Sequence, residues 1–551
     1  MAENQIGGQQ VLLLPEGSTR LLGRDAQRTN IAVAVAVANC VKTTLGPKGM
    51  DKMLVSDLGD IVITNDGATI LDEMNVEHPI AKIMVDIAKT QDKEVGDGTT
   101  TVVVLAGELL KGAGELVEQG IHPTTIINGY KMAADKAREI LLEKAKKVSF
   151  DDEQTLEKIA FVTMGSKNVG DDETKHRIAK LVISAVKQVM TEQNGKLTVD
   201  HDFIKIEKKA GGGVNDTELI KGVVIDKEVA HSGMPKTVNN ANIALLDLAL
   251  EIEKTETDAR IEITAPSQMQ EFLQQEERTL KSMVEKIAKS GANVVFTQKG
   301  IDDVAQHYMA KAGIMAVRRV KKSDIEKLAR ATNAKIVTSL EDLSKGDLGL
   351  AGLVEERKIS GEQMVFVERC KDPKSVTIFI KGGTQQVVDE AERSITDDIG
   401  AVSSIAERGF YVVGGGSIEM DLANGARNYA ADVGGREQLA IQKFADALEA
   451  AVPKTLAENA GMDSIDTLVQ LRSKHKSKEG STYGVDVIRN TIGDMSKLGV
   501  FEPLKVKEQI IDSASEAAEI IMRIDDIISS RAKTPAGGPR GGMEGMGGGE
   551  D

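Results

Sequence analysis

The chain has 551 residues, a formal net charge of −16, and only 3% aromatic residues with no tryptophan. This length exceeds what one compact core can hold, so about three domains are expected, and the acidity argues against nucleic acid as a partner because phosphate binding needs a basic surface. The two cysteines, Cys40 and Cys370, stand in no metal-ligand spacing, and no run approaches the ~18 apolar residues of a membrane span, so we expect a cytoplasmic protein without disulfides, zinc or membrane contact.

The first part of the chain is predicted to be mostly helical. Residues 30–45 alternate Ala and Val, so the spacing alone allows a buried strand as well as a buried helix. The high Ala content and a cap at Asn30 favour the helix. Two short strands are expected at 52–55 and 61–64, and further buried helices are expected from residue 99 onward and over 123–142.

The middle of the chain has a different pattern. Residues 151–194 are polar and amphipathic, and from 220 to 374 strands and helices alternate, which predicts a separate α/β domain. Its strands are expected at 243–250, 293–297, 315–320 and 334–338, and its helices at 267–289, 302–311 and 324–330. Helical sequence is expected to resume after 377 and to continue nearly to 531, followed by a disordered Gly-rich tail, 534–551.

A glycine-rich stretch, GDGTTT at residues 96–101, directly precedes a predicted helix. Gly96 and Gly98 let the backbone approach phosphate oxygens, and the helix N-terminus favours anions. Threonine hydroxyls add hydrogen-bond donors, and Asp97 is placed to hold a magnesium ion. An ordinary loop before a helix remains an equal alternative for this stretch alone.

Three more stretches have both an ordinary and a functional interpretation. Residues 44–49 (TLGPKG) can simply stop a helix, and Asp66 in NDGAT can be a local cap. The triplet Gly414–Gly416 can be an ordinary turn. Their joint occurrence in one chain is more informative than any of them alone.

Taken together, these stretches resemble the signatures of group II chaperonins, the family of the thermosome. The similar segments are TLGPKGMDKML, ITNDGATIL and HPIAKIMVDIAKTQDKEVGDGTTTVVVLAGELL. The resemblance continues through GVVIDKEVAHSGMPKTVNNANIALLD, the glycine triplet, FEPLKVK and the Gly-Met tail, so it covers essentially the whole chain.

The resemblance implies a multidomain α+β fold that is nested along the chain. A mainly helical equatorial domain would come from 1–150 and 410–533, a small intermediate domain from 151–220 and 376–409, and an α/β apical domain from 221–375. A helical protrusion at about 252–285 would act as the lid of the ring.

The same resemblance implies an ATPase that uses ATP and Mg²⁺. Asp97 would hold the metal, Asp66 and Asp397 would act on the attacking water, and Lys167 would sense the γ-phosphate. The other nucleotide-binding residues implied are Thr44, Leu45, Gly46, Pro47, Gly98, Thr99, Thr100, Thr101, Gly414, Gly415, Asp486 and Glu502.

The segment around Asp397 departs from the family pattern. Asp398 stands where a small residue is usual, and Gly400 and Ser403 replace apolar residues. A second carboxylate beside a general base can raise the pKa of that base. Activity is therefore expected, with its rate and pH dependence open.

The implied partners are non-native client proteins and related subunits in a homo- or hetero-oligomeric double ring, with no separate lid co-chaperonin. Met269 and Phe272 either belong to a buried helix face or face partners. Two other classes compete: a small-molecule kinase that uses the GDGTT loop, and a passive holdase, suggested only by Asp398. A kinase would give no reason for a domain split between both chain ends.

Overall fold

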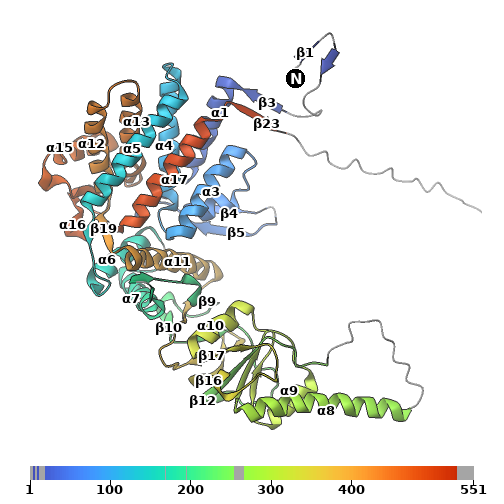
Figure 1. The fold of residues 1–551 in the computed structure, drawn as a ribbon. Coiled ribbons are helices and arrows are strands. Elements are labelled where there is room, and N and C mark those ends of the chain that lie inside the picture. The colour runs from blue at the N-terminus through green and yellow to red at the C-terminus, as the bar shows by residue number, and fades with distance from the viewer. Residues whose placement is uncertain are drawn as a thin grey trace, which may run out of the picture.

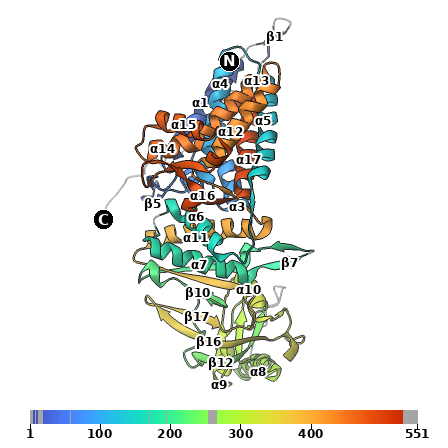
Figure 2. The same ribbon diagram turned by 90° about the vertical axis from the view of Figure 1, so that its left-hand side faces the viewer.

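The computed structural model describes residues 4–6, 9–11 and 19–529, except 57, 168, 194 and 253–265. These residues form three bodies stacked along one direction (Figures 1 and 2). The helical body comprises 19–147 and 410–529, the linking layer 153–220 and 376–408, and the sheet body 223–368. Each body has its own hydrophobic core. The predicted protrusion falls partly on 253–265, and the predicted tail wholly beyond 529, so those parts lie outside the described residues.

The helical body is built around α4, which is buried on nearly every side because its residues are almost all Val, Leu, Ala and Gly. Close contact with α1 is possible because Gly107 lacks a Cβ, which would lie 2.3 Å from the Cβ of Ala38. The helices are α1 (Gly23–Lys42), α2 (Gly67–Glu73), α3 (Pro79–Val95), α4 (Thr99–Glu118), α5 (Pro123–Lys144), α12 (Ser417–Asp432), α13 (Glu437–Glu449), α14 (Thr455–Asn459), α15 (Ser464–Lys474), α16 (Met495–Leu498) and α17 (Leu504–Met522).

The predicted helix over 30–45 is confirmed as α1, but the predicted cap at Asn30 is wrong. The helix begins at Gly23, so Asn30 lies in its interior. Its side chain is buried and both its polar atoms lack a hydrogen-bond partner. The apolar alternation starts only after Asn30, but the preceding polar stretch is helical as well and already contains the buried Ala26.

Several short strands pair near the chain ends and in the helical body, and two of these small sheets join the N-terminal part of the chain to its C-terminal part. The hairpin of β4 (Lys52–Val55) and β5 (Ile61–Thr64) has the predicted bounds, and its apolar side chains are largely exposed. The remaining strands are β1 (Asn4–Ile6) with β2 (Gln9–Val11), β3 (Thr19–Leu22) with β23 (Asp526–Ser529), β6 (Lys146–Lys147) with β19 (Phe410–Val413) and β22 (Phe501–Pro503), and β20 (Tyr483–Asp486) with β21 (Thr491–Asp494).

The linking layer packs three helices over a three-stranded sheet of order β10–β18–β9. Helix α11 crosses the molecule between the helical body and this sheet (Figure 1). The elements are α6 (Glu153–Thr163), α7 (Asp172–Val189), α11 (Gln385–Arg408), β7 (Thr191–Gln193), β8 (Lys196–Thr198), β9 (Ile204–Ala210), β10 (Glu218–Ile220) and β18 (Val376–Gly382).

The sheet body confirms the predicted α/β alternation. Its sheet has the order β11–β17–β16–β12–β13–β14, with β15 pairing with β12, and it is parallel from β12 to β14 and antiparallel from β12 to β11. The elements are β11 (Val223–Ile225), β12 (Thr237–Leu246), α8 (Pro266–Ser290), β13 (Val294–Thr297), α9 (Asp303–Lys311), β14 (Met315–Val317), α10 (Lys322–Thr332), β15 (Ile336–Val337), β16 (Gly349–Ile359) and β17 (Glu362–Glu368).

Several strands differ from the prediction. The strand expected at 243–250 runs over Thr237–Leu246 instead. Strands β16 and β17 were not predicted, and in β16 the charged residues 355–358 interrupt the apolar pattern. The expectation of continuous helix after 377 is wrong, since β18 to β22 interrupt it. In a short buried strand nearly every residue is apolar, so the sequence shows no alternation that would distinguish the strand from a buried helix.

The two halves of α8 have different surroundings. Leu280, Val284 and Ile287 are buried against the sheet, whereas Met269 and Phe272 are exposed. The N-terminal half of the helix extends away from the sheet body (Figure 1). Within the part of the chain that the structure describes, no helix is both long and apolar enough to cross a membrane.

Candidate functional site

The glycine-rich loop joins the end of α3 to the start of α4. Gly96 ends α3 with φ +71°, and Gly98 caps α4 with φ +81° and without a side-chain hydrogen bond to the helix. Both values lie in the left-handed region that favours glycine. The N-terminus of α4 therefore presents its first N–H groups, with Thr99, Thr100 and Thr101, to any anion held by the loop.

Asp66 lies at the start of α2 and touches the start of α4. It accepts hydrogen bonds from Thr69 N, Thr69 Oγ1 and Thr99 Oγ1, each at 2.7 Å. Burial alone would raise the pKa of Asp66, but Lys167 and these hydrogen bonds more than offset it, so the pKa lies below its usual value. Asp66 is therefore a helix cap, as its ordinary interpretation predicts, and is also held ionised beside the loop.

Lys167 joins the helical body to the linking layer. It follows a short turn after α6, and its Nζ lies 2.9 Å from Asp397 Oδ2 on α11 and 3.9 Å from Asp66 Oδ1. Burial would lower the pKa of Lys167, but the two aspartates raise it above its usual value. The lysine is thus a buried cation and not a solvated surface charge.

Asp397 and Asp398 are adjacent on α11 and both buried. Burial raises the pKa of Asp397, and repulsion from Asp66 adds to this while Lys167 opposes it. Asp398 is fully buried, and neither of its carboxyl oxygens has a hydrogen-bond partner. Burial, followed by repulsion from Asp397 and Asp97, raises the pKa of Asp398 well above its usual value.

Asp97 in the glycine-rich loop has the properties of a cation ligand. Its Oδ1 accepts a hydrogen bond from Gly98 N at 2.6 Å, and its Oδ2 accepts one from Thr163 Oγ1 at 3.4 Å. Burial and repulsion from Glu502 raise the pKa of Asp97. No three acidic, His or Cys side chains converge as a metal cage among the described residues. A single carboxylate suits Mg²⁺, which usually binds one or two carboxylates and completes its shell with water and phosphate.

The loop after α1 lies beside the same helix N-terminus. Thr44 Oγ1 and Thr100 Oγ1 are 3.4 Å apart, and Asn459 Nδ2 donates to Leu45 O at 2.9 Å. Gly46 has φ +83°, and a Cβ there would lie 2.3 Å from Leu456 Cδ2. The loop containing Thr44, Leu45, Gly46 and Pro47 is therefore held against α4 and α14.

The glycine triplet connects β19 to α12 and lies next to Glu502. A Cβ on Gly414 would lie 2.2 Å from Glu502 Oε1, so only glycine leaves room for this carboxylate. The Nζ of Lys507 lies 2.5 Å from Glu502 Oε2 and 2.7 Å from Glu419 Oε1. The lysine thus connects Glu502 on β22 to Glu419 at the start of α12.

Asp486 is adjacent to the triplet but has a turn-capping role. Val485 N donates to Gly415 O at 2.9 Å, which brings β20 alongside the triplet. Asp486 Oδ1 accepts hydrogen bonds from Ile488 N at 3.2 Å and Arg489 N at 3.1 Å. No direct contact joins Asp486 to Asp66, Asp97 or Asp397 within the described residues.

Three residues near the loop were not predicted. Burial and repulsion from Asp66 raise the pKa of Asp92 to about 6. Gln91 Nε2 donates to Asp97 O at 2.7 Å, and Lys507 is buried beside Glu502. The sequence signal for Gln91 and Asp92 was their position, about one helical turn before the loop on the helix that leads into it.

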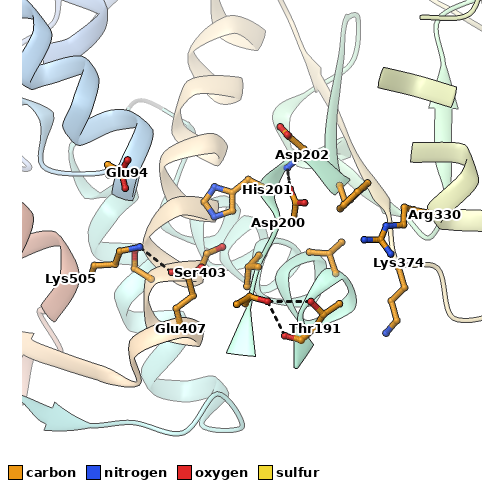
Figure 3. Close-up of a pocket in the computed structure, with 15 residues that line it drawn as sticks. Glu94, Thr191, Asp200, His201, Asp202, Arg330, Lys374, Ser403, Glu407 and Lys505 are labelled. Carbon is orange, nitrogen blue, oxygen red and sulfur yellow. Dashed lines mark hydrogen bonds and ion pairs between the residues drawn. The ribbon is translucent and has the colours of Figure 1, made fainter. Parts of the chain in front are cut away.

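A cavity of about 470 Å³ lies elsewhere, where the three bodies meet (Figure 3). Glu94 and Lys505 come from the helical body, His201 and Glu407 from the linking layer, and Arg330 from the sheet body. Lys505 forms an ion pair with Glu407 at 3.0 Å. Burial lowers the pKa of His201. The cavity contains none of the predicted nucleotide-binding residues, so its size does not identify the functional site.

A helical body built from both chain ends, a linking layer crossed twice and a centrally inserted sheet body define the architecture of a chaperonin subunit. Residues 37–532 match the TCP-1/cpn60 chaperonin family. The chain is 59% identical to the thermosome subunit of Methanopyrus kandleri over 95% of each chain, and 59% identical to that of Pyrococcus horikoshii over 99% of each. It is 55% identical to the thermosome subunit of Methanocaldococcus jannaschii over 99% of each chain. The chain belongs to the TCP-1/cpn60 chaperonin family, and the predicted resemblance to its group II members is confirmed.

Proposed function

We propose that this chain is one subunit of an ATP-hydrolysing double ring that encloses non-native proteins and helps them fold. The observation that carries the ATPase proposal is the contact of Lys167 with Asp66 and Asp397, which come from different bodies. Because Asp66 and Asp397 come together only where the two bodies meet, the reaction would depend on the relative position of these bodies. Hydrolysis and movement would then be coupled.

The proposed cofactors are ATP and Mg²⁺. The N-terminus of α4 and its three threonines would hold the phosphates, and Asp97 would hold the metal, which spreads phosphate charge when bound. Thr44, Leu45, Gly46 and Pro47 would line the pocket together with Gly98, Gly414, Gly415, Asp486 and Glu502.

Asp397 and Asp66 have different proposed roles. The raised pKa of Asp397 suits a group that accepts a proton from the attacking water, whereas Asp66, held ionised by three hydrogen bonds, suits a group that orients the water. Lys167 would contact the γ-phosphate and lose that contact when the phosphate leaves. It would thereby report nucleotide state to the linking layer.

The proposed domains follow the three bodies. Residues 1–150 and 410–533 would be equatorial, 151–220 and 376–409 intermediate, and 221–375 apical, with 534–551 as a tail. The proposed lid is the protrusion at about 252–285, and the exposed Met269, Phe272 and Leu273 on α8 would meet clients or neighbouring lids, which makes a separate lid protein unnecessary.

The proposed partners are non-native proteins and other subunits of the ring. The β4–β5 hairpin supports self-assembly, because Met53, Val55 and Ile61 expose apolar side chains on a two-stranded edge. The net charge of −16 supports a role without nucleic acid. We propose that the ring works in the cytoplasm and away from membranes.

Replacing Asp397 by Ala tests this function. Because the proposed phosphate contacts lie elsewhere, Asp397→Ala should still bind ATP with Mg²⁺ but lose turnover by roughly 10²–10⁴-fold. Phosphate release and ATP affinity, measured on assembled rings, separate an ATPase from a holdase that binds nucleotide without hydrolysing it. Normal phosphate release by the variant would reject the role of Asp397, and absence of turnover in the unaltered ring would reject the ATPase.

A further inference from the structure

Two glycines from different bodies face each other next to Asp397. Gly400 lies in the interior of α11, and Gly96 ends α3. A Cβ on Gly400 would lie 2.7 Å from Val95 O and 2.8 Å from Gly96 Cα. A Cβ on Gly96 would lie 3.0 Å from Gly400 Cα and 3.2 Å from Asp397 O. The two backbones are therefore in direct contact, with no side chain between them.

Gly400 is unfavourable for the helix that contains it. Glycine in a helix interior loses more conformational freedom than alanine, and Gly400 replaces an apolar residue of the family pattern. The atoms it faces cannot move aside easily, because they are backbone atoms of the α3 terminus and of Gly96 in its left-handed conformation. The advantage of glycine at this position must therefore come from the contact itself.

We propose that Gly400 is a positioning residue for hydrolysis, whose missing side chain sets how closely α11 brings Asp397 to the loop at residues 96–101. Asp397 precedes Gly400 by three residues and so lies on the same face of the helix. The distance between α11 and α3 then determines how far the carboxylate of Asp397 lies from Asp66 and from the loop, which both belong to the helical body. This inference rests on the proposed role of Asp397.

An alanine at position 400 would separate the two backbones. Ordinary contacts between carbon atoms are about 3.5–4.0 Å, so relieving a 2.7–2.8 Å approach requires a shift of about 1 Å. A misplacement of about 1 Å at a reacting group can reduce turnover about 100-fold. ATP affinity should be largely retained, because the predicted phosphate-binding groups other than Lys167 belong to the helical body.

The experiment compares Gly400→Ala with Gly114→Ala in full-length assembled rings. For Gly400→Ala we expect unchanged ATP affinity, phosphate release reduced about 10- to 100-fold, and a melting temperature that is not lowered, since alanine favours the helix. Gly114 lies in α4, where a Cβ would be 3.4 Å from Ile31 Cδ1, an ordinary contact. Its alanine variant should keep normal turnover.

A rescue variant separates positioning from damage to the fold. The variant Asp397→Glu alone should hydrolyse ATP slowly. The double variant Gly400→Ala/Asp397→Glu should hydrolyse ATP faster than Gly400→Ala, because the longer glutamate side chain spans the added distance between α11 and the loop. Unchanged turnover in Gly400→Ala, or no gain in the double variant, overturns the proposal. So does a Gly400→Ala chain that fails to assemble or melts earlier, because Gly400 would then serve the fold. Normal turnover in Asp397→Ala would instead reject the proposed function on which the inference rests.

Discussion

Two clusters of buried charge in this chain are balanced in opposite ways. Glu449 on α13 is buried between Arg427 and Arg472, and Arg472 Nε lies 3.0 Å from its Oε2. Burial alone would raise the pKa of Glu449, but the two arginines lower it below its usual value. Around Asp397 and Asp398, by contrast, Lys167 pairs with Asp397 but not with Asp398, and both carboxyl groups have raised pKa values.

The difference separates a cluster that stabilises the fold from one that is poised to react. A fully paired acid stays ionised over the working pH range and contributes only to structure. Where several acids lie together with fewer cations than acids, the acids bind protons that can be transferred, and the group readily binds a positive ion. Raised pKa values, rather than burial alone, distinguish the second cluster and suit the role proposed for Asp397.

Removing the paired acid should have the largest effect on stability. Glu449→Ala removes a buried acid from between Arg427, which keeps Asp446 as a partner, and the half-exposed Arg472, and we expect the free energy of unfolding to fall by about 2 kcal/mol. Denaturant unfolding of the assembled ring measures this, with turnover of the remaining folded rings unchanged. Asp446→Ala is the matched control, because it removes an exposed partner of Arg427 and should cost less than about 1 kcal/mol. Equal losses in both variants would show that Glu449 is not the structural centre of its cluster.

Removing the lysine of the other cluster should affect movement more than stability. Lys167→Ala should bind and hydrolyse ATP but close about tenfold more slowly, since the contact that differs between nucleotide states is gone. Loss of the lysine raises the pKa of Asp397 further, so phosphate release is best measured near pH 8. A fluorescent pair on the linking layer and helical body follows closure after mixing with ATP. Lys180→Ala, an exposed lysine on α7, is the control, and closure as fast as in that control would return Lys167 to a structural role.

The smallest effect, of opposite sign, is expected at Asp398. Its pKa is raised above the unfolded value of about 3.9, so the folded chain binds more protons, and stability falls as the pH rises through the raised pKa. Asp398→Ala removes that loss. We expect no advantage near pH 4, a gain of up to about 1 kcal/mol at neutral pH, and turnover that is kept or increased.

Denaturant unfolding of Asp398→Ala at several pH values tests this sign. Asp398→Asn keeps the shape of the side chain without its charge and should follow the same trend with pH. A lower unfolding midpoint at neutral pH in both variants would mean that the carboxylate is paired in the ring, contrary to its isolation in the subunit.

Local sequence patterns predicted many element bounds of the helical body. The hairpin β4–β5 was predicted with its observed bounds, because apolar residues end at turn residues on both sides. The starts of α4 and α5 were also predicted, since a glycine loop precedes one and a His-Pro pair begins the other. Strand β16 could not be predicted, because four consecutive charged residues, 355–358, interrupt its apolar pattern.

The composition of the site was less predictable. Residue spacing cannot bring Asp66, Lys167 and Asp397 together, since their contact depends on how the bodies dock, and only the family resemblance grouped them. Lys507 and Asp92 were missed because a buried charge and a solvated charge look alike in one sequence. Gly400 was noticed as a departure from the family, but its contact with Gly96 became clear only from the packing of α11 on α3.

The nested order of the three bodies constrains how a newly made chain can fold. The core of the sheet body is contiguous, from Val223 to Cys370, so it can be completed as soon as those residues have been synthesised. Helix α4, in contrast, needs α13 and α17, which come from the last part of the chain, before its apolar surface is covered. During synthesis part of the apolar surface of α4 therefore stays uncovered while the centre of the chain can already be folded. A subunit that helps other proteins fold thus completes the core around its own N-terminal helices only after its C-terminal part has been made.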